Sequence, residues 1–333
     1  MSLRQLLTYA HQDDAFEALA DAARESPQRA FVSASLRPYL VAALLDAEPA
    51  RPGLVVVGDD RAARDLAGDL KAFLEPRPVR FYPARGVRYE SHLAPAPHLV
   101  GLRVAALDSL LDERERDGDG AIVVASAAAL AEKVPDPELR PHGFAIERAG
   151  LLDLDETTER LVACGYQRVD QVEDRGQFAL RGDILDIYPA TEERAVRCEL
   201  FDVEVERLTF FSTFTQRSLE EVERVEIAPA AELAPELREL AEIAATDDGD
   251  ARPDVAELLP VERFRDVLGL VPAQALVCLA AEDEIAPALA DQWEDVTTSF
   301  HDRDAHELYL SPEYVQGALA QRAAVTLSSL SGD

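Results

Sequence analysis

The stretch Gly53–Leu74, "GLVVVGDDRAARDLAGDLKAFL", holds a short apolar strand followed by an amphipathic helix. A nearly uninterrupted apolar run of this length is typical of a strand that is covered on both faces of a sheet. In the helical part, apolar residues recur at the spacing of one helix face. These residues are Ala63, Leu66, Ala67, Leu70, Phe73 and Leu74. The stretch therefore predicts one unit of a parallel α/β sheet.

The same alternation continues on both sides of this unit. Apolar runs at 29–35, 79–83 and 121–126 are separated by segments with helical periodicity. Two later runs, 275–282 and 323–330, have the same character and are expected to extend the first sheet. The fold class is therefore α/β, with a parallel sheet core and with an inserted domain between its two parts.

The inserted part has a different pattern. A helix is expected that Asp153 or Asp155 caps and Gly165 ends. Short strands follow, and the segments "EDRG" and "FDVE" between them are interpreted as hairpin turns. This pattern predicts a small α+β domain with an antiparallel sheet.

Three segments follow from these patterns. Residues 1–127 form the first part of the α/β core, 128–214 the inserted α+β domain, and 215–333 the second part of the core, which is expected to be helical and acidic at first. The Asp-rich stretch 246–254 is the best candidate for a loop or linker.

Composition narrows the class of function. The chain has 33 basic and 64 acidic residues, a net charge of -31, which opposes broad binding to nucleic-acid phosphates. Such acidity also serves solubility or adaptation to salt. Three widely spaced cysteines fit a reducing compartment better than a disulfide framework or a zinc site. With no apolar run of about 20 residues and no signal-peptide core, a cytoplasmic chain with no membrane contact is expected.

The sequence offers few candidates for chemistry. A nucleotide-binding loop needs glycines to wrap phosphates and a lysine to reach them, and "FVSASLRPYL" contains neither. We therefore expect no ATP hydrolysis at this position, no catalytic residues and no cofactor. His301 and His306 lie near Asp302 and Asp304, but a spacing of five residues is weak as a metal motif, and ordinary surface polarity is the favoured interpretation.

A charged strand, "RGQFALRGDILDIYP" at 175–189, is the most informative feature of the inserted domain. A hairpin folded around "EDRG" would place Arg168 within a residue or two of facing Arg181, with Arg175 at the turn. Strand alternation would put Phe178, Leu180 and Ile184 on one face, and Arg181 and Asp183 on the other.

Two interpretations of these arginines stay open. Asp170, Asp183 and Asp186 could neutralise them in surface ion pairs, each worth under about 1 kcal/mol. Alternatively, planar guanidinium groups on a rigid sheet could bind carboxylates of a partner in a bidentate manner.

The segments "GYQRVDQVEDRGQFALRGDILDIYPA" and "TQRSLEEVERVEIAPA" resemble a module shared by bacterial transcription-repair coupling factors (Mfd) and the excinuclease protein UvrB. The resemblance implies a helicase-like core, here with a degenerate P-loop, and an inserted domain that binds the excinuclease protein UvrA. Carried over by position, the UvrA contacts are Arg168 and Arg181, with Phe178 and Arg175 as neighbours. A further family arginine, two positions before Arg181, is Ala179 in this chain.

The function that the resemblance implies is that of a non-catalytic docking module. It would recruit UvrA to RNA polymerase stalled at a DNA lesion, in nucleotide excision repair. The whole family protein is an ATP-dependent translocase that also contacts RNA polymerase and double-stranded DNA, and its C-terminal domain can mask the UvrA-binding surface. Two alternatives are an ATP-using, UvrB-like excinuclease component and a purely structural domain that braces a translocase.

Overall fold

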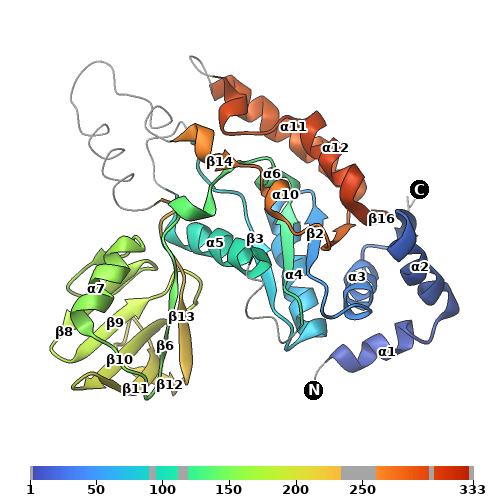
Figure 1. Cartoon of the computed structure of the whole chain (residues 1–333). Helices are drawn as coiled ribbons and strands as arrows, with labels where there is room; N and C mark the ends of the chain where they lie inside the picture. The colour runs from blue at the N-terminus through green and yellow to red at the C-terminus, as the bar shows by residue number, and fades with distance from the viewer. Residues whose placement is uncertain (1–2, 90–94, 112–118, 234–259, 300–303, 330–333) are drawn as a thin grey trace. The chain divides into compact units, whose positions relative to one another are not determined.

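The computed structural model describes residues 3–89, 95–111, 119–233, 260–299 and 304–329, and the chain divides into two compact units (Figure 1). The first unit comprises Met1–Arg85, Ala106–Val134 and Phe264–Asp333, and the second comprises Gly86–Ala105 and Pro135–Arg263. These bounds differ from those of the three predicted segments, whose division into domains stays a prediction. The Asp-rich stretch 246–254 lies outside the described residues.

The first unit is built on a six-stranded sheet in which every neighbouring pair is parallel. Its spatial order is β1 (Gln28–Val32), β16 (Ala323–Ser329), β15 (Leu276–Leu279), β2 (Gly53–Val57), β4 (Ile122–Ser126) and β3 (Val79–Tyr82). The two late strands lie between β1 and β2, so the prediction that they extend the first sheet is confirmed. The α/β fold class with an antiparallel insertion is confirmed as well.

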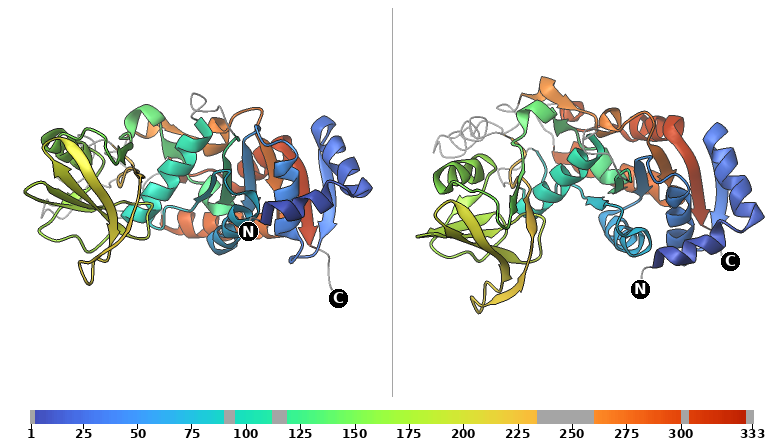
Figure 2. Two further views of the ribbon diagram at one scale, coloured as in Figure 1. Left: turned by 90° about the horizontal axis from the view of Figure 1, so that it is seen from below. Right: turned by 60° about the horizontal axis from the view of Figure 1, so that its bottom comes forward.

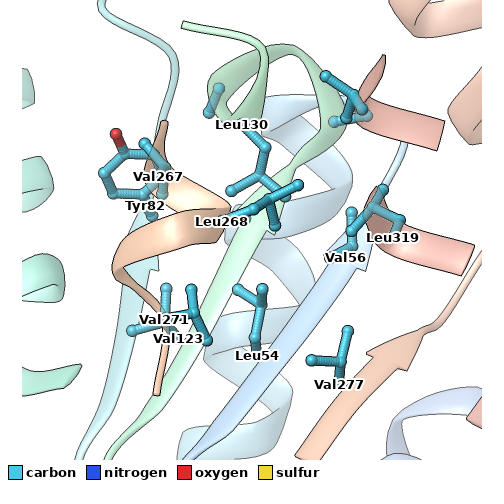
Figure 3. Close-up of a cluster of buried hydrophobic side chains, with 14 of the residues drawn as sticks. Leu54, Val56, Tyr82, Val123, Leu130, Val267, Leu268, Val271, Val277 and Leu319 are labelled. Atoms are coloured by element: carbon cyan, nitrogen blue, oxygen red, sulfur yellow. The ribbon is translucent and has the colours of Figure 1, made fainter. Parts of the chain in front are cut away.

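Helices cover both faces of this sheet. The helices of this unit are α1 (Leu7–Ala10), α2 (Asp14–Glu25), α3 (Arg37–Asp46), α4 (Asp60–Leu74), α6 (Ala127–Leu130), α10 (Val267–Leu270), α11 (Glu282–Ser299), α12 (Pro312–Arg322) and, from Ala106 on, the end of α5 (Pro97–Leu111). Helix α4 is capped by the Asp59 side chain and contacts β2, β3 and β4, and its predicted apolar face is buried except for Phe73, which is half-buried. On the opposite face, Leu54, Val123 and Val277 of the sheet pack with side chains of α10 and α12 (Figure 3).

The second unit contains a six-stranded sheet and a separate two-stranded one. The larger sheet runs in the order β12 (Ser218–Glu221), β11 (Glu204–Phe211), β10 (Ala195–Phe201), β9 (Ile184–Tyr188), β8 (Gln177–Arg181) and β7 (Gln167–Arg168). The smaller sheet pairs β6 (Phe144–Glu147) with β13 (Arg224–Ile227). Two-residue strands β5 (Val134–Pro135) and β14 (Phe264–Arg265) complete the described strands.

Helix α7 (Leu154–Ala163) packs on one face of the larger sheet (Figure 2). As predicted, Asp153 caps it through a hydrogen bond from the Glu156 N–H to Asp153 Oδ1 (3.0 Å), and Gly165 follows its end with a φ of 91°. Leu161 of the helix packs with Phe178 and Ile187 of the sheet in the core of this unit.

The prediction that the chain turns helical from about residue 215 was wrong for its first part. Residues 218–221 and 224–227 form β12 and β13. In "RVEI" of β13 the side chains of Val225 and Ile227 are buried while Arg224 and Glu226 are exposed, which is the alternation of a half-buried strand. The high content of Glu in this segment obscured that period.

All three cysteines, Cys164, Cys198 and Cys278, are buried, and none of them forms a disulfide. Burial raises the pKa of the Cys278 thiol to about 12 and raises the pKa of Cys198 as well. Because the thiolate is the reactive species, we expect no rapid reaction of the folded protein with a disulfide reagent at pH 8. Three thiols should become reactive in denaturant. Rapid labelling of the native protein would contradict the buried placement.

None of the helices in the described ranges combines the length and the apolar character needed to cross a bilayer.

Candidate partner-binding surface

The charged stretch 175–189 contains a β-hairpin rather than the single strand that was predicted. Strands β8 and β9 pair in antiparallel fashion, with Arg181 directly opposite Ile184. Gly182 and Asp183 form the two-residue turn, and Gly182 has a φ of 60°, which glycine adopts without a steric cost. The turn reverses the chain, so Ile184 lies on the same face as Arg181 and not on the face of Phe178.

The segment "EDRG" is not a hairpin turn, because β7 runs parallel to β8. In this register Arg168 lies opposite Phe178. Arg181 is three residues further along β8, which is about 10 Å. The prediction that Arg168 faces Arg181 within one or two residues was therefore wrong. The other proposed turn, "FDVE", is confirmed: Phe201 pairs with Glu204, and Asp202 between them has a φ of 57°.

The strand register assigns the two arginines to different faces of the larger sheet. We call the face that packs on α7 the helix face; it carries Phe178 and Leu180. The other is the loop face, which carries Ala179 and Arg181 because side chains alternate along β8. Arg168 lies opposite Phe178 and therefore on the helix-face side of edge strand β7, whereas Arg181 lies on the loop face.

A buried ion pair on the loop face, between Asp186 and Arg197, limits the contacts that Arg181 can make with the sheet. Asp186 is 2% exposed and binds Arg197 in a bidentate manner, with Nε–Oδ1 at 2.7 Å and Nη2–Oδ2 at 2.8 Å. This hydrogen bonding raises the pKa of Arg197, whose guanidinium also lies 4.6 Å from the centre of the Phe211 ring. The nearest carboxylate of the hairpin is thus already occupied on both oxygens.

Arg181 is consequently only loosely tied to the sheet. Its Nη2 lies 4.0 Å from Asp186 Oδ2, beyond hydrogen-bonding distance, and its side chain is 49% exposed. Arg168 is exposed and makes no ion pair with any residue in the described part of the chain. Of the three aspartates that could neutralise the arginines, only Asp186 forms an ion pair with one of them within the described residues, a long one with Arg181, and Arg168 pairs with none of the three.

The two residues predicted to accompany the arginines, Phe178 and Arg175, both take part in holding the domain together. Phe178 is fully buried among Leu161, Leu185 and Ile187, so the prediction that it supplies contact area to a partner was wrong. Arg175 is half-buried and its Nε donates to the Glu192 carbonyl oxygen (2.7 Å). Its guanidinium also lies 5.6 Å from the centre of the Tyr188 ring, so Arg175 fastens the segment before β8 to the end of β9.

The exposed apolar side chains of the second unit lie at positions that the sequence patterns did not single out. Phe201 is 76% exposed at the end of β10, and Leu151 is 82% exposed just before α7. The available signal was the "FDVE" turn: alternation from buried Cys198 and Leu200 points Phe201 outward.

The weak histidine candidate has a local explanation. His306 Nδ1 lies 2.7 Å from Asp304, and its ring packs edge-on against Trp293 with centroids 4.8 Å apart. His301 lies outside the described residues. Within the described ranges, no group of three or more His, Cys, Asp or Glu side chains is placed to hold a metal ion.

Comparison with protein families finds a match for most of the second unit. Residues 144–233 match the family model described as "UvrB interaction domain". The match spans α7, the whole larger sheet and both strands of the smaller one. Arg168, Arg181 and Phe201 all fall within it.

Individual relatives agree with the family match. The transcription-repair-coupling factor of Bacillus subtilis (strain 168) is 32% identical over 230 residues, 68% of this chain and 19% of that protein. The UvrABC system protein B of Yersinia pestis bv. Antiqua (strain Antiqua) is 31% identical over 213 residues, 60% of this chain and 31% of its own length. The aligned part thus spans about a fifth to a third of these curated relatives. The chain contains a UvrB interaction domain at residues 144–233, and its resemblance to the transcription-repair coupling factor and to UvrB is confirmed.

Proposed function

We propose that this chain is a non-catalytic docking module of nucleotide excision repair that captures UvrA. The observation that carries the proposal is the state of Arg181: an exposed guanidinium at the end of β8 whose neighbouring buried carboxylate is already bound by Arg197. Such a group keeps its bidentate donors for a carboxylate on another molecule. The match of this unit to the UvrB interaction domain supports UvrA as that molecule.

The geometry favours a partner surface that meets the β7–β8 edge of the larger sheet and extends from there onto the loop face. Arg168 projects from the edge strand on the helix-face side, and Arg181 lies about 10 Å further along on the loop face. A partner surface of ordinary size, about 800 Å² on each side, spans both positions. Recruitment to stalled RNA polymerase, through parts of a longer protein, is the setting that the similarity to the coupling factor supports.

The test is the affinity of purified UvrA for the wild-type chain and for Arg168→Ala and Arg181→Ala. We expect each substitution to cost about 1–3 kcal/mol of binding free energy, as is usual for exposed interface arginines. Arg194→Ala is the matched control: Arg194 is also exposed but pairs with Glu220 (2.9 Å) beside the opposite end of β10. It should bind as the wild type does.

Two outcomes would contradict the proposal. If both arginine variants capture UvrA as well as the wild type, the domain serves a structural role. Retention of ATP by the isolated chain in equilibrium dialysis would instead favour an ATP-using, UvrB-like excinuclease component. We expect none, since the connection between β1 and α3 contains neither Gly nor Lys.

A further inference from the structure

The loop face carries two exposed apolar side chains, Phe201 and Leu151, in one row with the exposed Glu204. Phe201 on β10 lies directly opposite Glu204 on β11, and Leu151 forms an isolated bridge with Glu204 on its other side. Directly opposed residues of neighbouring strands project to the same face, with Cβ atoms about 4.5–5.5 Å apart. Phe201 and Leu151 therefore flank Glu204 on one face.

Hydrogen bonds hold this row in place. The Leu152 N–H donates to the Val203 carbonyl (2.7 Å), and the Val205 N–H donates to the Gly150 carbonyl (2.9 Å). The segment before α7 is thereby fastened along the start of β11. Phe201 and Leu151 are 76% and 82% exposed although the backbone around them is held by these bonds. Phe201 and Leu151, with the exposed Glu204 between them, are thus held on a fixed backbone, and the packing of the second unit does not use the two apolar side chains.

The row is continuous with the surface around Arg181. Glu199 pairs with Ile184, and Ile184 with Arg181, so β8, β9 and β10 end together at this side of the sheet. The Leu200 N–H donates to the Asp183 carbonyl (2.9 Å), which ties the two hairpin turns together. Phe201 shares the loop face with Glu199 because the two are separated by one residue on β10. Two strand spacings, together with the two residues from Glu199 to Phe201 along β10, put Phe201 about 12 Å from Arg181.

We propose that Phe201 and Leu151 are the apolar anchor of the surface through which Arg181 binds UvrA. This inference rests on the proposed function and adds to it the apolar contact that Phe178, buried in the core, does not provide. The bound surface of UvrA would present a carboxylate to Arg181 and an apolar recess to Phe201. Interfaces depend on such desolvated aromatic anchors, with charged contacts around them.

The experiment measures purified UvrA binding to the whole chain carrying Phe201→Ser, Leu151→Ser, Arg181→Ala or Phe214→Ser. Phe214 is the matched control, because it is 95% exposed on the same unit but follows β11 at the end opposite Phe201. We expect Phe201→Ser to weaken binding at least about tenfold and Leu151→Ser to weaken it less. Phe214→Ser should bind like the wild type. Circular dichroism confirms that each exposed-site variant stays folded.

Salt separates the two kinds of contact. The effect of Arg181→Ala should shrink at high ionic strength, while that of Phe201→Ser should persist, because screening acts on charges and not on apolar burial. If Arg181→Ala weakens binding and Phe201→Ser does not, the anchor is refuted and the proposed function stands. If the wild-type chain fails to bind UvrA, the proposed function fails. Self-association that Phe201→Ser abolishes, without a change in UvrA binding, would identify a second copy as the occupant and overturn the inference.

Discussion

Replacing Arg197 by methionine is expected to lower the free energy of unfolding of the second unit by about 3–5 kcal/mol. The reason is the state in which Asp186 would be left. It is 2% exposed, both its oxygens bind Arg197, and the only other cation near it is Arg181 at 4.0 Å. Among the described residues, no other cation forms an ion pair with Asp186. A buried carboxylate that loses its partner keeps the whole cost of its desolvation.

Chemical denaturation combined with hydrogen exchange of the β9 and β10 amides would measure this loss. Arg194→Met is the control on the same sheet, because its ion pair with Glu220 is exposed and should be worth under about 1 kcal/mol. The double variant Arg197→Met with Asp186→Leu should recover most of the stability, since an apolar pair can replace a buried ion pair. A loss for Arg197→Met no larger than that of Arg194→Met would refute this account.

Arg77→Met should destabilise the first unit by roughly 3–5 kcal/mol. Arg77 is buried, and its guanidinium donates to the carbonyl oxygens of Leu45, Arg51 and Gly120. These carbonyls belong to the end of α3 and to the segments that enter β2 and β4. Burial lowers the pKa of Arg77 to about 10, so the group stays charged at neutral pH. The variant would remove three charge-assisted hydrogen bonds at once and leave buried acceptors without a donor.

Urea unfolding followed by fluorescence of Trp293, the single tryptophan of the chain, reports on the first unit. Arg61→Met provides the control, because Arg61 is exposed on α4 and its loss should change stability by no more than about 0.5 kcal/mol. Arg77→Lys should fall between the two, since an ammonium keeps the charge but cannot reach three separate carbonyls. Equal midpoints for Arg77→Met and Arg61→Met would show that the three hydrogen bonds contribute nothing net.

The sequence predicted the first unit well because its signals are local. The run Leu54–Val57 is apolar throughout and α4 is amphipathic. Together these two patterns are typical of a parallel sheet that helices cover on both faces. Even the late strands β15 and β16 were recognisable by the same apolar character.

The partner-binding surface was harder to predict because it depends on register. Val172 is buried with Ala179 and Phe211, so the chain crosses under the loop face between β7 and β8 instead of turning back at "EDRG". That packing makes β7 parallel and separates Arg168 from Arg181. The unrecognised turn at Gly182 and Asp183 is why Ile184 was assigned to the face of Phe178 rather than to that of Arg181. Phe178 was named as a contact from the family resemblance alone, although strand alternation already put it on the face opposite Arg181.

The order of strands in the first sheet bears on how the chain emerges from a ribosome. Strand β1 is made first, yet its only neighbour in the described sheet is β16, almost 300 residues later. All strands of the larger sheet in the second unit, by contrast, lie between residues 167 and 221. Contacts between residues distant in sequence form late. We therefore expect the second unit to fold during translation, whereas β1 can pair only after β16 has left the ribosomal exit tunnel.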